Sequence, residues 1–229
     1  MPASEASPRI CARRDVVGAV LLFTLQFTAH AGNIEVEIKE SDGTPVADAV
    51  VCATPLSGGT SALKGKAIVA QKNKQFVPYV TAIQKGTAVQ FPNQDDVKHH
   101  IYSFSPAKKF ELPLYAGTPA EPVVFDKAGL IALGCNIHDW MIGYILVVET
   151  PWFAVSAGNG RAQLRGLPAG TYQVEVWQPR LKGPPARTAQ RVAVGADSSP
   201  GTVSFRVDLK PDFRPRRGPT RSTDSARRR

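Results

Sequence analysis

Apolar and polar residues alternate along most of the chain, which is the pattern of half-buried β-strands. The alternation is clearest at residues 33–39 and 171–177, where every second side chain is apolar. No stretch keeps a 3.6-residue apolar period over three turns, so no long amphipathic helix is predicted. Further strand-like runs occur at 47–54, 67–71, 79–82, 88–91, 101–104, 122–125, 130–133, 142–149, 191–194 and 203–207.

Turn signals rich in Gly, Pro, Asn and Asp separate these runs, for example Asp42-Gly43 and Asn159-Gly160. Many short strands with regular turns predict an all-β fold built from sandwiches or Greek-key barrels. At 229 residues and 43% apolar content, the chain is long enough for one large or two small domains. We therefore predict an all-β protein in which a Greek-key β-sandwich is nested in, or lies beside, a second small β-sandwich.

Two separated segments look like the halves of one module. Residues 41–51 resemble the opening hairpin of a transthyretin-like, carboxypeptidase-regulatory type of β-sandwich, and residues 158–172 resemble its closing half. The simplest organisation is one sandwich made from residues 32–62 plus 150–209, with a second domain inserted at 63–149. Two or three consecutive sandwiches are the alternative.

The first 31 residues have the layout of a secretory signal peptide. Three Arg residues precede an apolar run at 16–27, and the Ala-His-Ala sequence at 29–31 supplies small residues for cleavage. The apolar run is shorter than the ~20 residues that a spanning helix needs, which disfavours a membrane anchor. We predict cleavage after Ala31, a periplasmic or secreted mature protein, and no stable membrane insertion.

The formal net charge of +9 is concentrated at the C-terminal end. Residues 210–229 contain eight Lys or Arg and two Asp, whereas the body of the chain is nearly balanced. This composition predicts a disordered basic tail. Because the protein is expected to be exported, we interpret the tail as a solubilising or surface-binding extension and predict no nucleic-acid partner.

The residues able to bind a soft metal are few and clustered. Once the leader is removed, the chain retains two Cys, three His and one Met. All three His and the Met fall within 99–100 and 135–141, and the second stretch also contains Cys135. A buried Cys and Met in a strand corner, beside exposed imidazoles, would explain each residue alone but not the cluster.

The stretch 135–141 is a short loop between two predicted strands, and it carries Cys135, His138 and Met141. His99 lies 36 residues before Cys135, just ahead of the run at 101–104. Two His, one Cys and a weak axial Met form the donor set of electron-transfer copper sites. Soft sulfur favours Cu(I) and imidazole suits both oxidation states, so such a site rearranges little when an electron moves.

Two other residues have plainer explanations. Neighbours on a strand point to opposite faces, so His99 and His100 are not expected to bind the same ion. Alternation alone does not decide between them, and the one that is not a ligand is expected at the surface or behind the ligands. Cys52 lies in an apolar run and is expected to be a buried small hydrophobe. A Cys52–Cys135 disulfide is the alternative in an oxidising compartment, but it leaves the His and Met cluster unexplained.

The order Phe-Pro-Asn93, His99 and then Cys-x2-His-x2-Met resembles the cupredoxins, and its loop spacing is most like that of amicyanin. The resemblance covers about residues 67–149. It implies that Asn93 ties the ligand loops together and that a redox partner docks on the apolar surface around His138. The ligands that it implies for one copper ion are His99, Cys135, His138 and Met141. The whole chain also looks like exported bacterial proteins labelled methylamine utilization proteins, a label that implies a pathway.

These features predict a carrier of single electrons between periplasmic redox proteins. One alternative is copper trafficking or storage, although the single mature Met argues against a Met-rich exchange site. Another is a carbohydrate- or protein-binding outer sandwich with the copper domain as an accessory. An enzyme is not expected, because a four-ligand site with an axial Met has no open position for substrate. If His99 and His138 bind the metal, only His100 remains to serve a Ser-His-Asp triad, and no nucleophile motif accompanies it.

Overall fold

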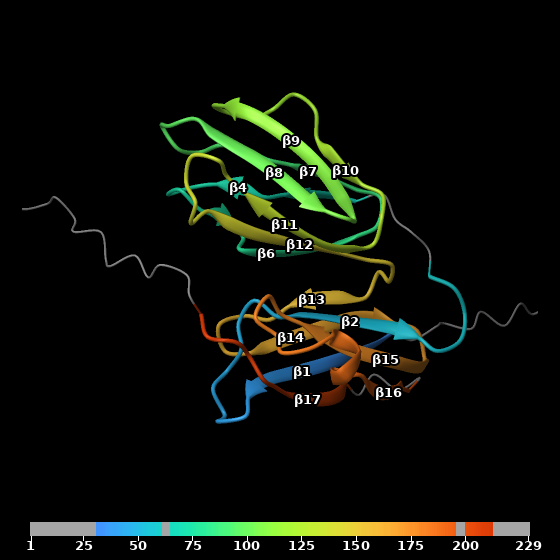
Figure 1. Ribbon diagram of the computed structural model, residues 1–229. Helices are drawn as coiled ribbons and strands as arrows, with labels where there is room; N and C mark the ends of the chain where they lie inside the picture. Colours follow the sequence, from blue (N-terminus) through green and yellow to red (C-terminus); the bar gives the residue numbers. More distant parts are fainter. Residues whose placement is uncertain (1–30, 61–64, 196–199, 213–229) are drawn as a thin grey trace, which may run out of the picture.

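The protein, described by a computed structural model over residues 31–60, 65–195 and 200–212, is built almost entirely of β-strands (Figure 1). The predicted all-β class is confirmed. The described residues contain one short 3-10 helix, η1 (Pro185–Thr188), and no helix with the length and hydrophobicity to cross a bilayer. Residues 1–30 of the predicted signal peptide and residues 213–229 of the predicted basic tail lie outside the described residues.

The outer sandwich consists of a three-stranded sheet, ordered β14-β1-β17, packed on a four-stranded sheet, ordered β13-β2-β15-β16. Its core follows the alternation seen in the sequence, because Ile34, Val36 and Ile38 of the first strand are all buried between the sheets. The strands are β1 (Gly32–Glu40), β2 (Val50–Pro55), β13 (Phe153–Val155), β14 (Arg161–Leu167), β15 (Gly170–Trp177), β16 (Gln190–Val194) and β17 (Gly201–Val207).

The inserted sandwich is formed by the strands between β2 and β13. A five-stranded sheet, ordered β6-β12-β11-β8-β9, faces a three-stranded sheet, β10-β7-β3, and the small β4-β5 pair. A separate buried cluster that includes Phe91, Phe125 and Ile145 fills this unit. Its strands are β3 (Lys66–Ile68), β4 (Ala70–Gln71), β5 (Phe76–Val77), β6 (Val80–Gln84), β7 (Thr87–Gln90), β8 (His99–Ser105), β9 (Lys108–Tyr115), β10 (Val123–Phe125), β11 (Gly129–Gly134) and β12 (Ile142–Val148).

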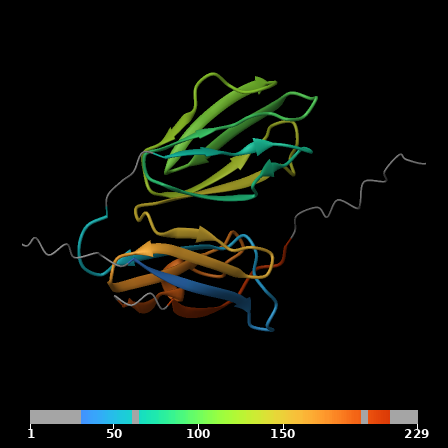
Figure 2. The ribbon, with the colours of Figure 1, turned by 180° about the vertical axis from the view of Figure 1, so that it is seen from behind.

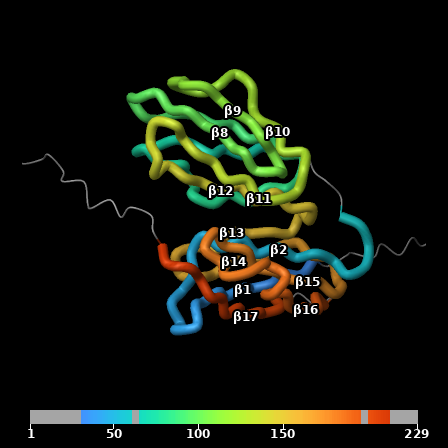
Figure 3. Tube along the Cα trace, in the orientation of Figure 1, coloured from blue at the N-terminus to red at the C-terminus, as the bar shows by residue number. Residues whose placement is uncertain are grey.

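The two sandwiches are stacked, and the chain passes from β12 of one to β13 of the other at one side of the stack (Figures 2 and 3). β2 pairs antiparallel with β13, with Cys52 opposite Phe153, so the segment that leaves the outer sandwich lies beside the segment that returns. An edge-to-face contact between the rings of Tyr144 and Trp177, with centroids 6.0 Å apart, joins the two units. The inserted unit is therefore anchored to the outer one at one sheet face.

Several strands differ from the sequence prediction, and β5 and β14, among others, lie outside all the predicted strand runs. β9 was not predicted, because Pro113 interrupts its pattern, yet it lies at the edge of its sheet, where a missing N–H is tolerated. β13, only three residues long, was not predicted either. β8 begins at His99 rather than at residue 101, and this places His99 on the strand itself.

Candidate metal centre

The three residues of the predicted ligand loop are held by a closed strand pair. β11 and β12 run antiparallel with Gly134 directly opposite Ile142, so residues 135–141 form the connection between two paired positions. Within this connection the Met141 N–H donates to the His138 carbonyl oxygen at 2.9 Å, which makes a tight turn. Two strands in register therefore fix where the loop begins and ends.

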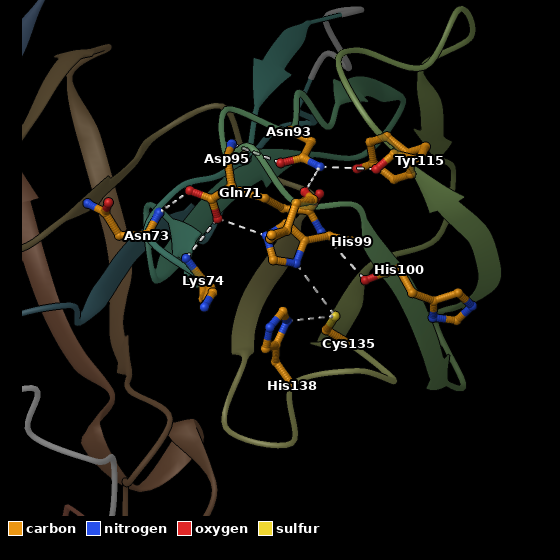
Figure 4. Close-up of polar contacts among 11 residues, drawn as sticks. Gln71, Asn73, Lys74, Asn93, Asp95, His99, His100, Tyr115, Cys135 and His138 are labelled. Atoms are coloured by element: carbon orange, nitrogen blue, oxygen red, sulfur yellow. Dashed lines mark hydrogen bonds and ion pairs between the residues drawn. The ribbon is translucent and has the colours of Figure 1, made fainter.

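His99, Cys135 and His138 converge in space. The Cys135 Sγ lies 4.0 Å from Nδ1 of His99 and 3.9 Å from Nδ1 of His138 (Figure 4). One candidate ligand atom from each residue lies within 4.8 Å of the others. His99 and Cys135 are buried, whereas His138 is half-buried. The structure thus brings together two imidazoles from separate segments and one thiol.

The spacing of these atoms fits a first-row transition metal. Metal–sulfur and metal–nitrogen bonds of about 2.3 and 2.0–2.1 Å with a trigonal angle would separate sulfur and nitrogen by about 3.8 Å. The observed separations of 3.9 and 4.0 Å are close to that value. Imidazole nitrogen and thiolate sulfur are ligands that suit copper and zinc.

Met141 lies in the same apolar core as Cys135. Its side chain is 2% exposed, and it lines with Cys135 the inner end of a surface hollow beside β8 and β11. Met141 is thus a buried thioether in the vicinity of the His–Cys–His cluster.

His100 points away from the cluster. Figure 4 shows its ring on the far side of β8 from Cys135 and His138. Its Nε2 lies 2.8 Å from Oε1 of Glu111 on β9, and its ring lies 5.7 Å from that of Tyr102. The side chain is buried rather than at the surface. The opposite orientations of His99 and His100 follow from the alternation of side chains along β8.

Asn93 supports the segment that leads to His99. Its Nδ2 donates to the carbonyl oxygens of Val97 at 2.8 Å and Tyr115 at 3.0 Å, and its Oδ1 accepts from the Asp95 N–H at 3.0 Å. These bonds join the His99 segment to the end of β9. The link to the loop that carries Cys135, which the resemblance implies, stays a prediction.

Asp95 is a site residue that the sequence analysis missed. Its Oδ2 lies 2.8 Å from Nε2 of His99, on the side of the ring opposite the cluster. Partial burial works to raise the pKa of Asp95, but hydrogen bonds from the Lys74 N–H, the His99 ring and the Asn73 N–H, with the charge of His99, hold that pKa below its usual value. The sequence feature that marks Asp95 is its position four residues before His99. Sequence alone cannot tell whether a carboxylate at that spacing contacts the histidine or stands there by chance.

The fold and this cluster define an all-β protein with a candidate metal site of nitrogen and sulfur donors. Neither the protein-family models nor the curated proteins gave a match. Among solved structures, the chain is similar to cupredoxins and to a copper-containing nitrite reductase, at low identity and partial coverage.

One is the copper-containing nitrite reductase of Thermus scotoductus, at 27% identity and a TM-score of 0.35 over 42% of this chain. This chain covers 25% of that one. A second is the purple cupredoxin of Nitrosopumilus maritimus, at 24% identity and a TM-score of 0.32, with 36% of this chain and 99% of that chain covered. A third is a mutant amicyanin in its Cu(I) form, at 19% identity and a TM-score of 0.33, with 42% and 98% covered.

Proposed function

We propose that the protein binds one copper ion through His99, Cys135, His138 and Met141, and that it carries single electrons between redox proteins outside the cytoplasm. The observation that carries this proposal is the convergence of two Nδ1 atoms on one buried Sγ at 3.9 and 4.0 Å. Bound copper supplies a one-electron couple between Cu(II) and Cu(I).

The chain supplies metal-ligand atoms that are held in place by the strands and largely shielded from water. His99 is held at the start of β8, and Cys135 and Met141 flank a loop closed by the β11–β12 pair. His99, Cys135 and Met141 are each at most 3% exposed, so little water reaches the donors. Ligands fixed in this way move little between the two oxidation states, which favours fast electron exchange. With Met141 in the fourth position, substrate has no open place, and we therefore propose a carrier rather than an enzyme.

Two exposed apolar side chains lie in the loop beside the half-buried His138. The ring of Trp140 lies 5.1 Å from that of His138, and Ile137 and Trp140 are 47% and 45% exposed. Such a surface supports brief contact with another protein, because a small apolar patch binds without strong directional bonds. We propose this surface as the docking site for periplasmic redox partners.

We also propose a domain organisation, a role for the outer sandwich and a route of export. Residues 63–149 would be the cupredoxin domain, inserted in a transthyretin-like sandwich made of 32–62 and 150–209. The outer sandwich would serve a glycan or protein partner. Export would follow cleavage after Ala31, in line with the resemblance to methylamine utilization proteins.

Visible absorption tests the copper site. The copper-loaded, oxidised protein should show an intense blue band from thiolate-to-copper charge transfer, and Cys135→Ser should abolish it because the thiolate is the source of that transition. Cys52→Ser is the matched control, since it removes the other described thiol, and it should leave the band intact. A colourless protein that prefers zinc, or a band lost in the Cys52 variant, would contradict the proposal. Reversible voltammetry of the wild type would then separate a carrier from a trafficking site.

A further inference from the structure

The ring of His99 is held from both sides. Its Nδ1 faces the Cys135 thiol at 4.0 Å, and its Nε2 meets the Asp95 carboxylate at 2.8 Å. A carboxylate only accepts hydrogen bonds, so a neutral His99 ring must carry its proton on Nε2. The lone pair on Nδ1 is then directed toward Cys135 before any metal binds.

The Asp95 carboxylate is in turn held by a distant hairpin. The turn between β4 and β5 is closed by paired bonds between Lys72 and Gln75, 2.9 Å from the Lys72 N–H and 3.1 Å from the Gln75 N–H. At its tip, the Asn73 N–H donates to Oδ1 of Asp95 at 2.6 Å and the Lys74 N–H donates to Oδ2 at 2.8 Å (Figure 4). Two backbone donors therefore bind one carboxylate.

The backbone of this turn is that of a two-residue β-hairpin of type I′, in which both central residues have a positive φ. Asn73 and Lys74 have φ values of 54° and 56°, in the left-handed region. Asn tolerates that conformation, whereas Lys adopts it at a cost of about 1 kcal/mol. In this conformation consecutive N–H groups point to the same side and form a small anion-binding concavity. The turn thus fixes the carboxylate, and the carboxylate stabilises the turn.

We propose that Asp95, anchored by the Asn73–Lys74 turn, is the positioning residue of the copper site: it fixes the tautomer of His99 and lowers the reduction potential by favouring Cu(II). This inference rests on the function proposed above. The carboxylate polarises the imidazole and makes Nδ1 a stronger donor. A negative charge behind a ligand stabilises the more highly charged Cu(II) ion more than Cu(I).

The expected fall in copper affinity can be taken from other proteins in which the hydrogen-bond partner of a metal-bound histidine is removed. Loss of such a partner typically lowers metal affinity by about 10- to 100-fold. If Cu(II) affinity falls tenfold more than Cu(I) affinity in Asp95→Asn, the reduction potential rises by about 59 mV. Asp96→Asn is the matched control, because it removes the same charge from the next residue, whose side chain is exposed.

Two measurements test the proposal separately from the copper function. In the metal-free protein, ¹⁵N NMR of the His99 ring should show the Nε2–H tautomer in wild type and Asp96→Asn, and a mixture of tautomers in Asp95→Asn. In the copper-loaded protein, the potential should rise in Asp95→Asn and in the smaller neutral variant Asp95→Ser, but not in Asp96→Asn.

The two hypotheses fail in different ways. If the blue band forms but both neutral variants keep the potential of Asp96→Asn, Asp95 is not a positioning residue, although the copper function stands. If His99 has the same tautomer in Asp95→Asn as in wild type, the positioning role is also wrong. If no copper binds, the NMR comparison still decides whether Asp95 sets the tautomer of His99.

Discussion

Cys52 and Cys135, both free thiols, lie in opposite chemical surroundings. Cys135 is buried between two imidazoles, where a metal would hold its thiolate. Cys52 lies on β2 with its Sγ 4.0 Å from the Glu175 carbonyl oxygen. Burial, with the charge of Glu175, raises the pKa of the Cys52 thiol from 9.0 to about 11. At neutral pH, Cys52 therefore keeps its proton.

The raised pKa of Cys52 predicts a specific loss of stability at high pH. The thiol loses its proton near pH 9 in the unfolded chain but near pH 11 in the folded one, so between these values the unfolded state binds fewer protons. Stability should therefore be unaffected by Cys52 below about pH 9 and fall between about pH 9 and 11, by up to about 2 kcal/mol for this half-buried group.

Urea denaturation under reducing conditions at pH 8 and pH 11 checks this prediction against Cys52→Ala. The variant lacks the thiol, so its free energy of unfolding should fall less between the two pH values than that of wild type. Other groups that titrate in this range are present in both proteins and cancel in the comparison. Equal falls in the two proteins would show that the folded state does not hold Cys52 protonated.

At the scale of the element, β11 delivers Cys135 through a glycine covered by an aromatic ring. Gly134 is paired with Tyr102 of β8, and a Cβ added to Gly134 would lie 2.6 Å from Cζ of Tyr102. The ring of Tyr102 also lies 5.1 Å from that of Phe104, which is 78% exposed. Tyr102 thus covers the backbone just before the thiol ligand, at the edge of the surface hollow that reaches Cys135.

Gly134→Ala should destabilise the protein because the added methyl group collides with Tyr102. Overpacking of this kind costs about 1–3 kcal/mol. In a Tyr102→Ala background the methyl group has room, so the same substitution should cost less, and a double-mutant cycle by urea denaturation measures the difference. Gly158→Ala is the control, because its Cβ would meet nothing within 4 Å, and it should change stability by no more than about 0.5 kcal/mol. Additive costs in the cycle would disprove the contact.

The sequence pattern was clearest for strands in which apolar and polar residues alternate strictly. Residues 33–39 and 171–177 correspond to β1 and β15, because a strand with one face in a core requires every second side chain to be apolar. β9 could not be predicted in the same way, since its edge position, which permits Pro113, is a property of the sheet and not of the segment.

The sequence predicted which residues make up the candidate site, but not the contact that Asp95 makes behind it. The clustering of soft ligands pointed to His99, Cys135 and His138, and the structure brings these three together. The contact between Asp95 and the β4–β5 turn joins residues 21 and 22 positions apart and depends on the left-handed backbone at the tip of that turn. No local sequence pattern predicts such a contact, because the turn and Asp95 come together only when the hairpin has folded against the loop.

At the scale of the whole molecule, two separate cores share one short boundary. The buried cluster of the outer sandwich and that of the inserted sandwich have no residue in common. At the boundary, the Thr150 hydroxyl donates to the Ala53 carbonyl oxygen, and the Ala53 N–H donates to the Trp152 carbonyl oxygen at 2.9 Å. The end of β2 therefore already lies beside the segment that enters β13.

This boundary predicts that the outer sandwich folds without the inserted one. Because Cys52 pairs with Phe153, continuing the same register places Leu56 opposite Glu149, so a two-residue Asn-Gly turn in place of residues 57–148 would make β2 and β13 a hairpin. The shortened chain should give a β-type circular dichroism spectrum and one cooperative urea transition, because its buried cluster is intact. Ile34→Ala in that chain, which truncates a side chain with no exposed surface, should lower its stability by about 2–5 kcal/mol. A shortened chain without a cooperative transition would mean that the outer core depends on the face supplied by β6 and β12, and that the two sandwiches form a single folding unit.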